Sequence, residues 1–89
     1  MAFVVDEKVE GLCGVVRERE FGKFFCDYNA AAEPYMSSIT AWRGIKAAMR
    51  FVREYRGPVL AVSRHAEGCR NLTRLGFSHG LKEYWIWVN

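Results

Sequence analysis

The stretch 57–88 constrains the fold more than any other part of the chain. An apolar run at 58–63 is followed by apolar residues at helical spacing over 64–75, where Gly76 ends the pattern. A second apolar run, rich in tryptophan, occupies 84–88. This order predicts a strand, a helix and a second strand parallel to the first, which is a βαβ unit.

Three short apolar runs near the N-terminus predict an antiparallel meander of three strands. They cover 3–5, 9–17 and 21–28, and the polar tripeptide 6–8 suits the first hairpin turn. Apolar residues fall on both faces of these strands. We therefore expect helices or a partner to cover both sides of the sheet.

A long amphipathic helix is expected after the meander. Ser37 and Ser38 form a good N-cap pair, and Gly57 with Pro58 ends the pattern about 18 residues later. The apolar stripe expected to pack on the sheet is Ile39, Trp42, Ile45, Met49, Val52 and Tyr55. The other face carries the cations Arg43, Lys46, Arg50 and Arg53. A solvated surface explains these cations, and the alternative is a phosphate-bearing ligand or an acidic protein partner.

Composition predicts a single soluble domain over residues 1–89. Of the 89 residues, 51% are hydrophobic, which is enough for one core. The three cysteines lack Cys-x-x-Cys spacing, so neither a disulfide framework nor a metal site is expected. No apolar run reaches the roughly 20 residues of a membrane span, and a net charge of +3 is too small to indicate nucleic acid. We expect a cytoplasmic protein with no membrane or nucleic-acid partner.

The second helix and its flanks resemble the last helix of the GNAT superfamily of N-acetyltransferases. Family members typically read N-x-x-A-x-x-L-Y-x-x-x-G-F, and this chain reads H-A-E-G-C-R-N-L-T-R-L-G-F over 65–77. His65 stands where the family usually has asparagine, and Leu72 stands where many members have a tyrosine general acid. The resemblance implies an α/β fold of GNAT type, with a mixed sheet of five to six strands and two helices. The implied order is βββαβαβ with a parallel crossover through each helix, lacking the family's N-terminal strand and helices.

Acetyl-coenzyme A is the cofactor that the resemblance implies, with its pyrophosphate at the start of the long helix. The family's phosphate loop is altered here, because the segment 43–47 lacks one glycine and lies inside the helical pattern. The residues that remain available to hold the cofactor are Ser37, Ser38, Arg43, Gly44, His65 and Arg70. We therefore expect a degenerate coenzyme A site.

No motif identifies catalytic residues. Leu72 cannot protonate a departing thiolate, so a substitute acid or base is needed. The available candidates are Asp27, Tyr28, Glu33 and Tyr84. Cys69 is expected in the core, and His65 is expected to be a polar residue at a helix start.

Small bacteriophage proteins that look like acetyltransferases offer a second resemblance, through Arg70-Asn71-Leu72 followed by Leu75-Gly76-Phe77. It implies a protein that acts by protein–protein contact in virion assembly or on a host protein, located in the host cytoplasm or in the virion. The alternative is a minimal acetyl-coenzyme A-dependent N-acyltransferase.

Two regions are expected to mediate association. The family elements absent from this chain usually cover the first strands, so apolar side chains within 3–5 or 9–16 should be exposed in a monomer. A partner or a second copy would cover them, burying about 1,200 Å² or more. The strand 84–88 is expected to be central and buried on both sides. At a sheet edge it would instead offer Trp85 and Trp87 as a contact patch.

Overall fold

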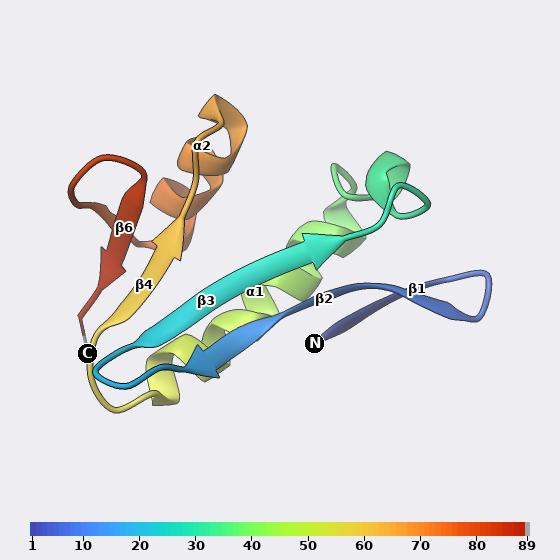
Figure 1. The fold of residues 1–89 in the computed structure, drawn as a ribbon. Coiled ribbons are helices and arrows are strands. Elements are labelled where there is room, and N and C mark those ends of the chain that lie inside the picture. The colour runs from blue at the N-terminus through green and yellow to red at the C-terminus, as the bar shows by residue number, and fades with distance from the viewer. Residues whose placement is uncertain (89) are drawn as a thin grey trace.

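The computed structural model describes residues 1–88, which form a mixed six-stranded sheet with two helices (Figure 1). The strands are β1 (Ala2–Val5), β2 (Lys8–Arg17), β3 (Gly22–Tyr28), β4 (Val59–Val62), β5 (Ser78–His79) and β6 (Tyr84–Trp87). The helices are α1 (Ile39–Glu54) and α2 (Ala66–Leu75), and the short 3-10 helix η1 (Glu33–Tyr35) precedes α1. The strands lie in the order β1-β2-β3-β4-β6-β5. The expected α/β class, a mixed sheet of five to six strands with two helices, is confirmed with six strands, although the element order has one more strand after α2 than expected.

The N-terminal meander has the predicted form. β1, β2 and β3 pair antiparallel in sequence order. Asp6 and Glu7 connect the first two strands with φ angles of 49° and 67°. Two successive positive φ angles give a turn whose twist matches that of the flanking strands, so a two-residue loop suffices.

The C-terminal unit differs from the predicted βαβ. β4 runs parallel to β3, but β6 pairs antiparallel with β4, and β5 lies on the outer side of β6. Helix α2 therefore leads into the two-residue β5, and a tight hairpin brings the chain back between β5 and β4. Lys82, with a φ of 57°, lies in that hairpin. The prediction of a last strand parallel to β4 was wrong because a strand as short as β5 leaves almost no apolar pattern in the sequence.

Helix α1 packs on the sheet through a stripe rotated from the predicted one. Ala41, Ala48, Met49 and Val52 are its buried residues, with Ile45 and Tyr55 packed partly against the core. Ile39 is 72% exposed and Trp42 is only half-buried, so their predicted place in the core was wrong. Alanines let the helix approach the strands closely, which moves the buried stripe toward Ala41 and Ala48.

Both helices pack against the same face of the sheet. One core cluster joins Met49 of α1 and Leu72 of α2 to strand residues such as Phe24 and Trp85. The ribbon shows both helices behind the sheet (Figure 1). We call this side the helix face. Within residues 1–88, helices therefore cover only one of the two faces, and of the two expected covers a partner remains the prediction for the other face.

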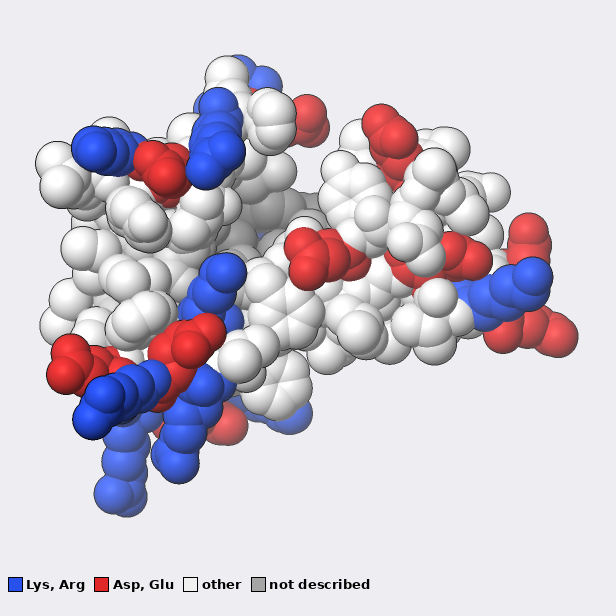
Figure 2. Space-filling view, viewed as in Figure 1, with Lys and Arg blue, Asp and Glu red and all other residues white. Residues whose placement is uncertain are grey.

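The opposite side, which we call the open face, is apolar and uncovered by any helix of residues 1–88. Strand alternation and register place on it Val4, Val9, Leu12, Val16, Phe25, Leu60, Val62, Tyr84 and Ile86, together with Lys23 and Asp27. Val4 is 61% exposed, Leu12 51% and Val16 47%. Figure 2 views this side and shows a broad white area over the strands.

The expectations for the first and last strands are met in part. Val4, Val9, Leu12 and Val16 are exposed as expected, whereas Phe3 packs partly against the core on the helix face. β6 lies between β4 and β5, as expected for an inner strand. Its burial is one-sided, because Trp85 is buried while Tyr84, on the open face, is exposed.

Candidate functional site

A cleft opens where β3 and β4 separate. The two strands pair in parallel only at Gly22 with Val59 and at Lys23 with Leu60. From Phe24 onward, no strand of residues 1–88 pairs with this edge of β3. The resulting cleft has a volume of about 780 Å³ and lies between β3, β4, the segment that leads into α1 and one side of α2. Figure 2 shows it as a hollow between two lobes.

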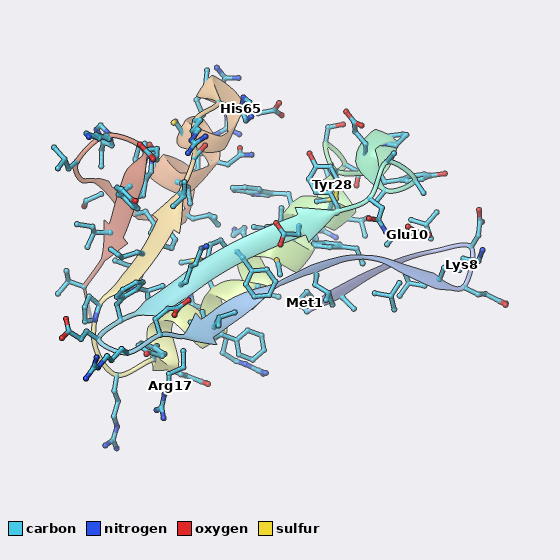
Figure 3. All side chains as sticks on the ribbon, viewed as in Figure 1. Met1, Lys8, Glu10, Arg17, Tyr28 and His65 are labelled. Carbon is cyan, nitrogen blue, oxygen red and sulfur yellow. The ribbon has the colours of Figure 1, made fainter. Side chains whose placement is uncertain are left out.

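The structure brings half of the predicted site residues, five of ten, to this cleft. Its lining includes Asp27, Tyr28, Glu33, Ser37 and His65. Figure 3 shows Tyr28 at the end of β3 and His65 at the start of α2, on opposite sides of the hollow. Tyr84 does not line the cleft, because it lies on β6, on the far side of β4 from β3.

The start of α1 is occupied by an ordinary cap. The Ser38 hydroxyl accepts a hydrogen bond from the Ala41 N–H at 3.1 Å, which satisfies one of the free donors of the first turn. Gly44 lies inside α1, and a Cβ there would be 3.1 Å from Cε1 of Phe3. The glycine therefore admits the Phe3 ring and allows β1 and α1 to approach each other. This packing explains Gly44 without a phosphate.

The charges of the cleft do not suit the phosphates of coenzyme A. Its lining carries the carboxylates of Asp27, Glu33 and Glu67 against one ammonium group, that of Lys23. Arg43 and Arg70, the predicted phosphate ligands, are exposed on their helices and do not line the cleft. An anionic pyrophosphate would meet more negative than positive charge. The unpaired edge of β3 offers backbone hydrogen-bonding groups, which suit an amide-containing ligand better than a phosphate.

Two thiols that sequence reasoning did not connect face each other beside the cleft. Cys13 on β2 and Cys26 on β3 are directly opposite in the ladder, and both are free thiols. The hydrogen bond from Cys26 lowers the pKa of Cys13, although burial opposes this shift. The same hydrogen bond raises the pKa of Cys26, reinforced by burial and by the charges of Cys13 and Asp27. The hairpin register could have revealed the pair, whereas their spacing along the sequence does not.

Other predicted features remain peripheral. The cations Arg43, Lys46, Arg50 and Arg53 are all exposed on α1. Cys69 is half-buried and packs partly against the core. Among residues 1–88, no helix is long and apolar enough to cross a membrane, and no group of three His, Cys, Asp or Glu side chains could hold a metal.

Comparison with protein-family models, with curated proteins and with solved structures found no match to this chain. In the described part of the chain, the two surfaces on which a ligand or partner could bind are the cleft and the open face.

Proposed function

We propose that this protein is a GNAT-like protein that acts by protein–protein contact, with the open face as its contact surface. The carrying observation is that apolar side chains on β1, β2, β4 and β6 remain exposed on one continuous side of the sheet. Patches of this kind on a soluble protein mark contact surfaces. The resemblance at Arg70-Asn71-Leu72 adds the setting, which is virion assembly or contact with a host protein in a bacteriophage.

The total solvent-accessible area of the chain supports the proposal that a partner covers part of its surface. The chain exposes 6499 Å², whereas a compact monomer of 10.3 kDa should expose roughly 5,400 Å². The difference, roughly 1,100 Å², exceeds the about 800 Å² that each partner buries in an interface of standard size.

The second candidate function is a minimal acetyl-coenzyme A-dependent N-acyltransferase. It is favoured by one observation, the unpaired edge of β3 along a cleft of about 780 Å³. The acidic lining and the buried, apolar Leu72 weigh against it, since neither the phosphates nor a leaving thiolate finds a matching group.

Calorimetry with acetyl-coenzyme A separates the two functions. We expect no saturable heat at micromolar cofactor. Binding at micromolar strength would overturn the non-enzymatic proposal. A Glu33→Gln variant serves as an internal check, because removing one carboxylate from the cleft should strengthen any residual binding of the anionic cofactor.

A further inference from the structure

We propose that the partner of the open face is a second copy of this chain, stacked sheet on sheet about a two-fold axis that lies between the two sheets, perpendicular to β3 and level with Phe25. This inference rests on the proposed function, because it names the occupant of the same surface. The observations behind it are the positions of the charged side chains on β3 and the sizes of the side chains on β2 and β3.

The two charges on β3 are placed for self-association. Lys23, Phe25 and Asp27 point to the open face, and a strand advances about 3.3 Å per residue, so each charge lies roughly 6.6 Å from Phe25 along β3. A two-fold axis in the interface plane, perpendicular to β3 at Phe25, exchanges these positions. Lys23 of one copy then faces Asp27 of the second copy, and the pair occurs twice. An axis parallel to β3 would instead place like charges together, so the charges select one arrangement.

The same rotation matches apolar groups on β2. Val16 lies level with Lys23, Gly14 with Phe25, and Leu12 with Asp27. The axis therefore brings Leu12 of one copy onto Val16 of the second copy, and both side chains are about half exposed in the single chain. Packing them together removes apolar surface from water on both copies, which favours association.

The centre of the interface is shallow enough for two sheets to stack. Gly14 has no side chain, and the Phe25 ring lies over it, 3.7 Å from the position of an ideal Cβ. Phe25 is therefore half-buried against its own sheet. Two such faces can approach to the separation of about 10 Å that is usual for stacked sheets.

Charge reversal tests the arrangement by sedimentation velocity from low to high micromolar concentration. Lys23→Asp places acid against acid, and Asp27→Lys places base against base. Each variant should weaken the dimer about 100-fold, because two favourable pairs become two repulsive ones. The double variant Lys23→Asp/Asp27→Lys restores opposite charges and should recover the dimer. Lys46→Glu, on the outer side of α1, is the control and should leave association unchanged.

Three outcomes would overturn the proposal, and they separate it from the proposed function. A wild-type chain that stays monomeric while its open face binds a hydrophobic dye would exclude the second copy and leave the face free for another protein. A dimer that Leu12→Ser disrupts, but that the charge reversals do not, would exclude the axis at Phe25. A dimer that none of these substitutions affects would use another surface, and the proposed function would fail with the inference.

Discussion

Phe24 and Phe25 are neighbours on β3 that face opposite sides of the sheet. Phe24 is 6% exposed, because α1 and α2 close the helix face over it, and its ring lies 5.6 Å from that of Phe77. The Phe25 ring lies over Gly14 on the open face and is only half-buried. The strands supply apolar residues to both faces, so the position of the helices decides which face becomes the core. The other face keeps its apolar surface for an intermolecular contact.

Substitution of the two phenylalanines gives the largest expected contrast between the faces. Phe24→Ala should lower the free energy of unfolding by about 3–5 kcal/mol, because it leaves a cavity in the core. Phe25→Ala should cost about 1 kcal/mol or less when the protein is dilute, because its ring is partly solvated already. Urea unfolding followed by circular dichroism measures both. Equal losses would show that the open face is packed in the single chain.

A second contrast concerns two positions two turns apart on the same side of α1. Met49→Ala should lower the free energy of unfolding by about 2–5 kcal/mol, since Met49 is buried against the sheet. Trp42→Ala should cost only about 1–2 kcal/mol, since Trp42 is half-buried. The same urea titration compares them. A larger loss at Trp42 would restore the stripe predicted from sequence spacing.

The start of α1 provides a smaller effect with a matched control. Ser38→Ala should lower the free energy of unfolding by about 1 kcal/mol, because the N–H of Ala41 loses its acceptor. Ser37→Ala should be close to neutral, because the cap bond of α1 belongs to Ser38. Thermal unfolding followed by circular dichroism measures both variants. An effect at Ser37 as large as that at Ser38 would show that the cap extends over both serines.

Substitutions on the open face should change stability least. Leu12→Ser and Val16→Ser should each stay within about 0.5 kcal/mol of the wild-type chain at low concentration, as expected for surface positions. They should, however, reduce the fluorescence of a dye that binds exposed apolar surface. Ile39→Ser is the control, because Ile39 is exposed but lies on α1, outside the open face. Dye binding that depends on Ile39 and not on Leu12 would locate the exposed patch elsewhere.

Local sequence signals predicted the helices, turns and most strands, whereas the order of the strands in the sheet depends on long-range pairing. The turn at 6–7, the cap at Ser38 and the left-handed Gly76 all act within a few residues, so the sequence indicates them directly. The place of β6 between β4 and β5 depends on the pairing of β5 with β6. A strand of two residues is too short to be predicted from the sequence pattern.

The sequence predicted several residues of the candidate site, but it did not predict the shape of the cleft. Asp27, Glu33, Ser37 and His65 do meet at one cleft. The cleft exists because β3 and β4 stop pairing after Lys23, and such a long-range pairing leaves no local pattern in the sequence. Its acidic character could not be predicted, because Glu67 joins the lining from α2, far along the chain from β3.

Carbene footprinting over a range of protein concentrations tests most directly whether the open face is a contact surface. In the dilute, monomeric protein, Leu12 and Val16 should be labelled strongly, and their labelling should fall as the concentration rises and a second copy covers them. Ile39 and Leu81, which are exposed outside the paired strands, should be labelled equally throughout. Weak labelling of Leu12 and Val16 even in the dilute protein would contradict the open face, because the chain would then cover it by itself.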